Sequence, residues 1–174
     1  MFDPITCALL ERLITGPPQT NHEWYRVWCS ILDQLFPLSR GYALAPLHRV
    51  TKDNRHTPYV AYNVSKFIDL TATPHSVLIV VIMESPDWQA CVPSLEKEIN
   101  RLTDATLSGT LMERAVPTSK IFWIGAIGHH WRYGVKEDNG GREMKPLIDW
   151  HETIHDEASY DDFQRLVALI ADLV

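Results

Sequence analysis

The sequence predicts a single α/β domain in which helices flank a mixed central sheet. Residues 77–82 are all aliphatic and residues 121–127 are apolar without alternation, which is typical of strands covered on both faces. Between these runs, apolar residues recur at helical spacing over 95–107, so that strand, helix and strand form a crossover unit. A chain of 174 residues with 45% apolar content is long enough for one domain, residues 1–174, with a core of its own.

Residues 1–37 are expected to form a helical N-terminal part. Asp3 can cap a first helix, and Pro4 is favoured at the first helical position. Gly16 and the two prolines after it end this helix. Asn21 can cap a second helix, in which apolar residues recur at spacings of three and four.

Residues 41–136 are expected to form the sheet core with its crossover helix. The predicted strands are rich in Val, Ile, Tyr and Phe and cover residues 41–50, 59–70, 76–84 and 120–128. The strand over 76–84 is expected at the centre of the sheet, with the last strand parallel to it. Ser94 can cap the crossover helix, and Gly109 is placed to end it.

Residues 137–174 are expected to form a hairpin return and a C-terminal helix. Asn139 and Gly140 separate two extended segments, which is a strong hairpin pattern. Ser159 and Asp162 resemble a capping box, and the apolar residues after them keep helical spacing.

The composition argues against nucleic acid as the main partner. The net charge of −6 is unfavourable for binding a phosphate backbone, which depends on Lys and Arg, so a protein or a small-molecule ligand is favoured. The N-terminus lacks the basic start of a signal peptide, and no apolar run approaches the roughly 20 residues that span a membrane. Three separated cysteines without a metal-binding spacing are expected to be free thiols. We therefore expect an intracellular protein, cytoplasmic or nuclear, without a membrane partner.

The order of elements and the residues after the central strand resemble a known family. The strand that ends in Glu84-Ser85-Pro86-Asp87-Trp88, the helix after it and the segment 124–132 are similar to uncharacterised fungal proteins with the restriction-endonuclease-like, PD-(D/E)XK, fold. The resemblance covers about residues 60–131. In those proteins the corresponding strand usually ends in Glu-x-Lys-Pro.

The resemblance implies a degenerate nuclease site. In the family an Asp and the acid of Glu-x-Lys hold a divalent metal such as Mg²⁺, and the Lys activates the attacking water. Asp69 is the candidate for the first acid and Glu84 for the second, but the Lys position is then Pro86, and aligning on the proline places Ile82 at the acid. A residual nuclease would need a lysine from elsewhere. The candidates are Lys66 and Lys120.

A second candidate site is the sequence HETIH. His151, Glu152 and His155 have the H-E-x-x-H spacing, which on a helix places two imidazoles on one face to share Zn²⁺ while the Glu activates water. His129 or His130 is the candidate for a third ligand. This alternative predicts a zinc-dependent hydrolase or metalloprotease.

The same segment has a purely structural interpretation. Asp149 and Glu152 can form a capping box for a short helix that starts at Trp150. The charged residues Asp156 and Glu157 follow at once. Zinc proteases with this motif resemble one another in having an uncharged residue and then an apolar one at these two positions, because their helix is buried.

Aromatic residues around the predicted hairpin are candidates for a binding surface. Trp123, Trp131 and Tyr133, with Arg132 beside them, could bind a partner or a flat ligand if they share one exposed face. The structural alternative is that they belong to the core.

Three functional hypotheses follow from the sequence. The favoured one is a non-catalytic binding protein on a nuclease-like fold that has lost its lysine. The alternatives are a zinc enzyme with Zn²⁺ at His151 and His155, and a nuclease with Mg²⁺ at Asp69 and Glu84.

Overall fold

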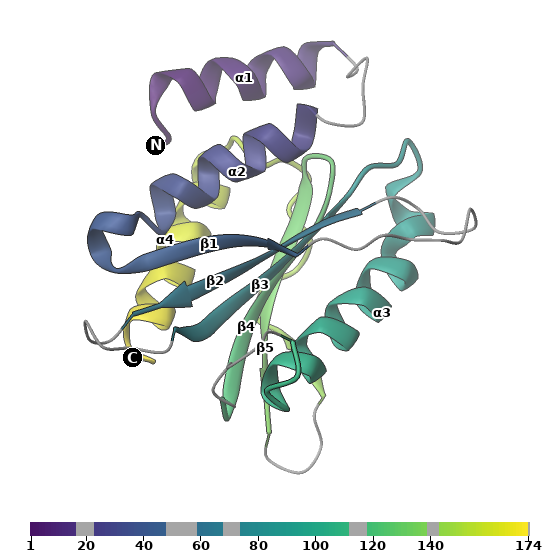
Figure 1. Ribbon diagram of the computed structural model, residues 1–174. Coiled ribbons are helices and arrows are strands. Elements are labelled where there is room, and N and C mark those ends of the chain that lie inside the picture. The colour runs from purple at the N-terminus through teal and green to yellow at the C-terminus, as the bar shows by residue number, and fades with distance from the viewer. Residues whose placement is uncertain (17–22, 48–58, 68–73, 112–117, 139–142, 174) are drawn as a thin grey trace.

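The computed structural model describes residues 1–16, 23–47, 59–67, 74–111, 118–138 and 143–173 (Figure 1). In this part of the chain, helices and strands follow one another in the order α1, α2, η1, β1, β2, β3, α3, β4, β5, β6 and α4. The α-helices are α1 (Pro4–Thr15), α2 (Glu23–Leu35), α3 (Trp88–Leu107) and α4 (Glu157–Ala171), and η1 (Leu38–Arg40) is a 3₁₀ turn. The strands are β1 (Tyr42–Leu47), β2 (Tyr59–Lys66), β3 (His75–Met83), β4 (Lys120–Ile127), β5 (His130–Glu137) and β6 (Met144–Pro146).

The strands form one mixed sheet in the order β1-β2-β3-β4-β5-β6. Strands β3 and β4 are parallel, and every other neighbouring pair is antiparallel. Helix α3 connects the parallel pair, so the predicted α/β class and the crossover unit are confirmed. The edge strands are β1 and β6, and each contains a proline, Pro46 and Pro146 respectively.

Strand β3 lies at the centre of the sheet, as its aliphatic sequence predicts. Its residues from Ser76 to Met83 are all buried. Successive side chains of a strand point to opposite faces, so both faces of β3 need cover. Leu78, Val80 and Ile82 pack in the core that contains α2 and α4, while Ile79 and Val81 pack in the core under α3.

Helices cover both faces of the sheet, which gives three layers. Figure 1 shows α3 on one side and α2 and α4 on the other. Helix α1 packs against α2 at the outside of that second layer. Asp3 caps α1 by accepting bonds from the backbone N–H groups of Ile5 and Thr6, as predicted. Asn21 lies outside the described residues.

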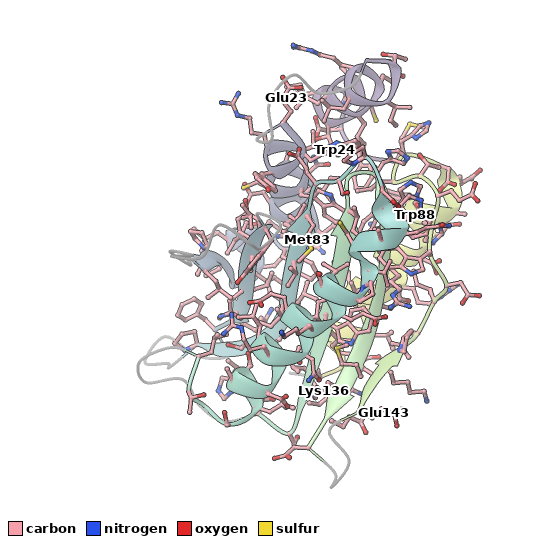
Figure 2. The ribbon with its side chains drawn as sticks, turned by 90° about the vertical axis from the view of Figure 1, so that its right-hand side faces the viewer. Glu23, Trp24, Met83, Trp88, Lys136 and Glu143 are labelled. Carbon is pink, nitrogen blue, oxygen red and sulfur yellow. The ribbon has the colours of Figure 1, made fainter. Side chains whose placement is uncertain are left out.

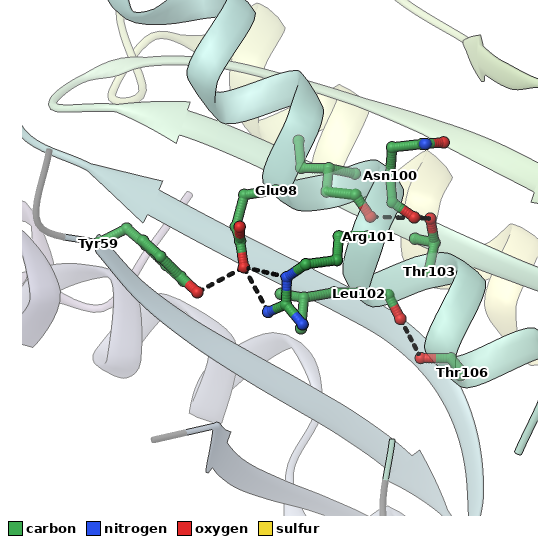
Figure 3. A network of polar contacts seen from close by, with 8 residues as sticks. Tyr59, Glu98, Asn100, Arg101, Leu102, Thr103 and Thr106 are labelled. Carbon is green, nitrogen blue, oxygen red and sulfur yellow. Dashed lines mark hydrogen bonds and ion pairs between the residues drawn. The ribbon is translucent and has the colours of Figure 1, made fainter. Parts of the chain in front are cut away.

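Helix α3 is anchored to the sheet by a buried carboxylate (Figure 3). Glu98 is 8% exposed and accepts a hydrogen bond of 2.5 Å from the hydroxyl of Tyr59 on β2. The guanidinium of Arg101, one turn further along α3, donates to the same carboxylate. A buried charge is tolerated when it is paired and hydrogen-bonded in this way.

The crossover helix begins earlier than the sequence predicts. Its N-cap is Asp87, which accepts a bond of 3.1 Å from the backbone N–H of Ala90, and not Ser94. The prediction placed the N-cap at Ser94, directly after Pro93, because Ser is a favoured capping residue. The structure accommodates Pro93 within α3, where the proline ring is exposed. The predicted end is confirmed, since Gly109 follows the helix with a left-handed φ of 71°.

The C-terminal helix also begins earlier than predicted. Asp156 caps α4 by accepting a bond of 2.7 Å from the backbone N–H of Ser159. Ser159 is buried within α4 and accepts a bond of 3.0 Å from the indole N–H of Trp131. The predicted capping box of Ser159 and Asp162 is therefore wrong, because the hydroxyl of Ser159 is used in the core.

The predicted hairpin is confirmed as the antiparallel pair of β5 and β6, although β6 is short. The turn at 139–142 lies outside the described residues. No helix in the described ranges is both long and apolar enough to pass through a membrane.

Candidate functional site

A cleft lies at the end of the molecule where the parallel strands β3 and β4 finish. Its volume is about 570 Å³, and its walls come from α1, α2, the start of α3 and the segments after β3 and β4. Figure 2 shows Trp24 and Trp88 at this end, near Met83, with Lys136 and Glu143 at the opposite end. Carboxyl ends of parallel strands are a common position for binding sites in α/β proteins.

A tight turn after β4 brings its polar residues next to the end of β3. Gly128 has a left-handed φ of 61°, which favours glycine, and its N–H donates a bond of 3.0 Å to the carbonyl of Met83. The carbonyl of Gly128 accepts a bond of 3.2 Å from the indole of Trp28. His129 and His130 follow this turn, and they line the cleft together with Glu84.

A row of aromatic rings follows the same end of the sheet. The ring centroids of Trp24 and His129 lie 5.8 Å apart, and those of His129 and His130 lie 4.2 Å apart. His130 stacks on Trp88 at 4.4 Å, and Trp88 contacts Trp150 at 5.2 Å. Two indoles therefore flank two imidazoles across the cleft, which offers flat apolar surface to a ligand.

The surroundings of both imidazoles favour their neutral form. Burial lowers the pKa of His129 below 6.5, and the charge of His155 lowers it further. Burial also lowers the pKa of His130, with a further contribution from His129, while Glu152 and a backbone bond to His151 oppose this. Nδ1 of His130 is buried and has no hydrogen-bond partner among the described residues.

Glu84 supplies the carboxylate of the cleft. Burial raises the pKa of Tyr25 to about 12, and the charge of Glu84 adds to this shift because the carboxylate lies near the phenol. Among the described residues that line the cleft, Glu84 is the single acidic side chain, and none is Lys or Arg.

The lysines proposed to replace the missing catalytic lysine lie at the other end of the sheet. Lys66 ends β2 beside His75, the first residue of β3, and Lys120 begins β4. Glu84 follows the last residue of β3, so the length of that strand, about 26 Å at 3.3 Å per residue, separates it from both. Neither lysine can reach Glu84, and this part of the residual-nuclease hypothesis is wrong.

The proposed first acid, Asp69, lies outside the described residues. The register of β2 against β3 pairs Tyr59 with Met83 and Lys66 with His75. The end of β2 that leads towards residue 69 is therefore opposite to the end that adjoins Glu84.

The segment HETIH is not helical. His151 forms an isolated antiparallel bridge with Trp131, so its backbone N–H and carbonyl both bond to that residue. The predicted short helix from Trp150, with Asp149 and Glu152 as its capping box, is wrong because this bridge holds the backbone extended.

The side chains of HETIH have other partners. Nε2 of His151 lies 2.9 Å from a carboxylate oxygen of Asp162, and its ring stacks on Trp131 at 5.1 Å. Nδ1 of His155 bonds to the hydroxyl of Thr153. The helical geometry on which the zinc hypothesis depends is absent, and the described part of the chain contains no group of three or more His, Cys, Asp or Glu side chains that could hold a metal ion.

The aromatic residues proposed as a binding surface belong to the core instead. Trp131 and Tyr133 are buried on the face covered by α2 and α4, whereas Trp123 is buried on the face covered by α3. Arg132 points to that second face, forms an ion pair with Glu96 and lies over the ring of Trp150. Alternation along a strand separates these neighbours, so they share no exposed surface.

Two residues of the cleft, Trp24 and Trp88, were not predicted as site residues. Trp24 matches the apolar stripe of α2 and is 4% exposed, so its pattern indicates only core. Trp88 comes directly after the Ser-Pro-Asp segment that follows β3. The position of Trp88 could have indicated the site, because it follows β3 closely and the end of β4 was predicted to lie beside the end of β3.

Comparison of the chain with protein-family models gives no match, and a search of curated proteins finds no significant similarity.

Proposed function

We propose that this protein acts by binding a protein or small-molecule ligand in the cleft at the ends of β3 and β4, without cleaving nucleic acid. The observation on which this rests is the composition of the cleft. An acidic side chain, two neutral imidazoles and two indoles line it, and none of the described lining residues is a lysine or arginine.

The fold supports an origin from a restriction-endonuclease-like protein. Two antiparallel strands precede the buried strand β3, and a helix then leads to the parallel strand β4 and a hairpin, which is the arrangement that the resemblance implies. Glu84 stands at the tip of β3, where that family places its acidic motif, and Pro86 replaces the lysine.

Cleavage of a phosphodiester would be poorly supported by this cleft. The reaction needs a metal held by oxygen ligands and a group that activates water. The side chain of Pro86 can neither hold a metal ion nor activate water. Lys66 and Lys120, the two lysines considered as substitutes, lie at the far end of the sheet. A phosphate backbone beside Glu84 would also meet a like charge, and none of the described residues that line the cleft is a Lys or Arg that could offset it.

Ligand binding, in contrast, fits the dimensions and chemistry of the cleft. Its volume of about 570 Å³ lies within the usual range of ligand sites, about 300–1,000 Å³. The half-buried indole of Trp88 offers apolar surface, and Nδ1 of His130 is a buried hydrogen-bonding atom that has no partner among the described residues.

The proposal can be tested by screening ligands with NMR. We expect members of a small-molecule fragment set or of a peptide library to shift the amide signals of residues 84–88 and 128–130. The Trp88→Ala variant should weaken these hits, since it removes one wall of the cleft. Leu147→Ala, an exposed apolar residue outside the cleft, is the matched control.

A second assay distinguishes binding from catalysis. Labelled DNA and RNA are incubated with the protein and Mg²⁺ or Mn²⁺, and we expect no cleavage above that of the Glu84→Gln variant. Metal-dependent cleavage that disappears in Glu84→Gln would contradict the proposal and restore the nuclease hypothesis.

A further inference from the structure

A second cavity lies next to the cleft, on the same side of α1. It has a volume of about 580 Å³, and its walls come from the N-terminal residues, α1 and the start of α4. Phe2 and Leu10 lie behind its wall as buried core residues, and Phe2 packs edge-on against Tyr160 at 5.3 Å. The inference drawn below rests on the proposed function, because it treats the cleft as a binding site.

Helix α1 is a wall of both cavities. Cys7, Leu10 and Glu11 line the second cavity, and Leu13 and Ile14 line the cleft. These residues follow one another along the helix, and Cys7 and Ile14 are about 10 Å apart at 1.5 Å per residue. The two cavities are therefore consecutive stretches of one surface along α1.

The segment before α4 connects the two cavities on their other side. His155 lines the second cavity and His129 lines the cleft. They lie close enough for the charge of His155 to lower the pKa of His129. A ligand that extends beyond the cleft along α1 would therefore enter the second cavity.

The charged side chains that line this surface are acidic, and the α-amino group of Met1 also lies at the second cavity. Glu11, Asp156, Glu157 and Asp161 line the second cavity and Glu84 lines the cleft. Asp156 also caps α4, so its carboxylate is partly engaged by the N–H of Ser159. None of the described lining residues of either cavity is Lys or Arg, and such a surface favours a cationic ligand.

The surface alternates between acidic and apolar groups. Apolar side chains of α1 and Trp24 lie between Glu84 at one end and the acidic residues at the start of α4 at the other. From Pro4 to Ile14, α1 covers about 15 Å, which corresponds to about four or five residues of an extended chain. These dimensions exceed a single small molecule and suit a short peptide segment.

We propose that the cleft and the second cavity together bind one segment of a partner protein in which Lys or Arg residues alternate with apolar residues. One cationic side chain would lie near Glu84 and Trp88, which both line the cleft and are half-buried. Another would lie among Glu11 and Asp161, and the apolar side chains between them would contact α1.

The test uses a dye-labelled ten-residue peptide in which Arg and Leu alternate, with fluorescence anisotropy as the readout. A matched peptide contains citrulline in place of Arg, which keeps the shape and removes the charge. We expect the Arg peptide to bind at least tenfold more tightly than the citrulline peptide, since a hydrogen bond to a charged group contributes about that factor. Raising the salt concentration should weaken binding of the Arg peptide alone.

Variants of the protein locate the peptide. Glu84→Gln and Asp161→Asn should each weaken binding of the Arg peptide about tenfold, and neither should affect the citrulline peptide. Glu143→Gln, which removes an exposed carboxylate at the opposite end of the molecule, is the matched control and should leave binding unchanged (Figure 2).

The outcomes separate this inference from the proposed function. Equal affinity for the Arg and citrulline peptides, or equal effects of Glu84→Gln and Glu143→Gln, would overturn the inference. If neither peptide binds while Trp88-dependent fragment hits persist, the inference fails and the proposed function stands. Displacement of the Arg peptide by DNA of similar length, with loss of DNA binding in Glu84→Gln, would contradict both.

Discussion

His151 illustrates how one residue can match a motif without having its function. The H-E-x-x-H spacing has chemical meaning only on a helix, where residues four apart share a face. Here the backbone of His151 is bonded to Trp131 and its imidazole lies beside Asp162. The pairing depends on residues 20 positions before and 11 positions after it in the sequence, so local spacing could not indicate it.

This arrangement predicts a structural role for His151. His151→Ala should lower the free energy of unfolding by about 1–2 kcal/mol, because Asp162 loses this hydrogen-bond partner and Trp131 loses the imidazole that stacks on it. The exposed His155→Ala is the control and should change it by less than about 0.5 kcal/mol. Urea denaturation measures both.

Metal analysis of the same variants tests the competing hypothesis. Protein purified without chelator should contain far less than one zinc ion per chain, and neither substitution should alter that content. Stoichiometric zinc that is lost in both variants would contradict the structural interpretation of HETIH.

His129 and His130 predict a pH dependence of stability. The unfolded chain binds protons at the ordinary His pKa of 6.5, whereas the folded protein binds them at these residues only at lower pH. The unfolded state therefore gains more protons as the pH falls below 6.5, and folding stability decreases over that range. The groups that face the pair are His155, on the side of His129, and Glu152, on the side of His130.

The measurement is urea denaturation at pH 7.5 and pH 5.0. A double variant, His129→Gln with His130→Gln, should lose less stability on acidification than the parent protein does. His75→Gln, at the opposite end of β3, is the control and should keep the parental difference. An unchanged pH dependence in the double variant would show that other groups cause it.

At the scale of single elements, the apolar runs were predicted well, but the starts of α3 and α4 were not. The continuous aliphatic run of β3 leaves no alternative to a strand covered on both faces. The start of α3, however, was predicted at Ser94, whereas its cap is Asp87 and Pro93 lies inside the helix. Local propensity is a weak criterion here, because packing of α3 against the sheet offsets the cost of an internal proline.

The two possible starts of α3 can be compared by mutation. Asp87→Ala should lower the free energy of unfolding by about 1 kcal/mol, since it removes the acceptor for the N–H of Ala90. Ser94→Ala is exposed within the helix and should have almost no effect. Denaturation of both variants measures the difference, and a larger effect at Ser94 would contradict the observed cap.

The first turn of α3 also determines part of the cleft. Because the helix begins at Trp88, this residue is fixed at the end of β3 and can stack on His130. A helix that began at Ser94 would leave Trp88 in a loop, so the error in the predicted start concealed a residue of the site.

At the scale of the whole molecule, the sequence predicts the mixed sheet and its parallel pair, but not the cleft. The parallel pair follows from two buried strands joined by a helix. The cleft instead requires contacts between distant segments, such as Trp24 of α2 with His129 after β4. No periodicity or spacing in one sequence contains such contacts, whereas the position of Glu84 at a strand end could be predicted.

The order of the strands predicts how hydrogen exchange is distributed. The amides of β3 and β4 should exchange most slowly, because these strands are buried and paired on both sides. Those of β1 and β6 should exchange orders of magnitude faster, since each has one neighbour. Exchange monitored by NMR tests this, and protection of β1 equal to that of β3 would contradict the strand order.

The prolines of the two outer strands also affect edge-to-edge pairing of strands between separate protein molecules. Pro46 and Pro146 each lack an N–H group, so neither border of the sheet presents a complete ladder of donors to a strand from another molecule. Growth of the sheet from chain to chain, the first step towards fibrils, is thereby discouraged at both borders. Proline in both outer strands is thus a feature of the backbone that disfavours aggregation independently of any ligand.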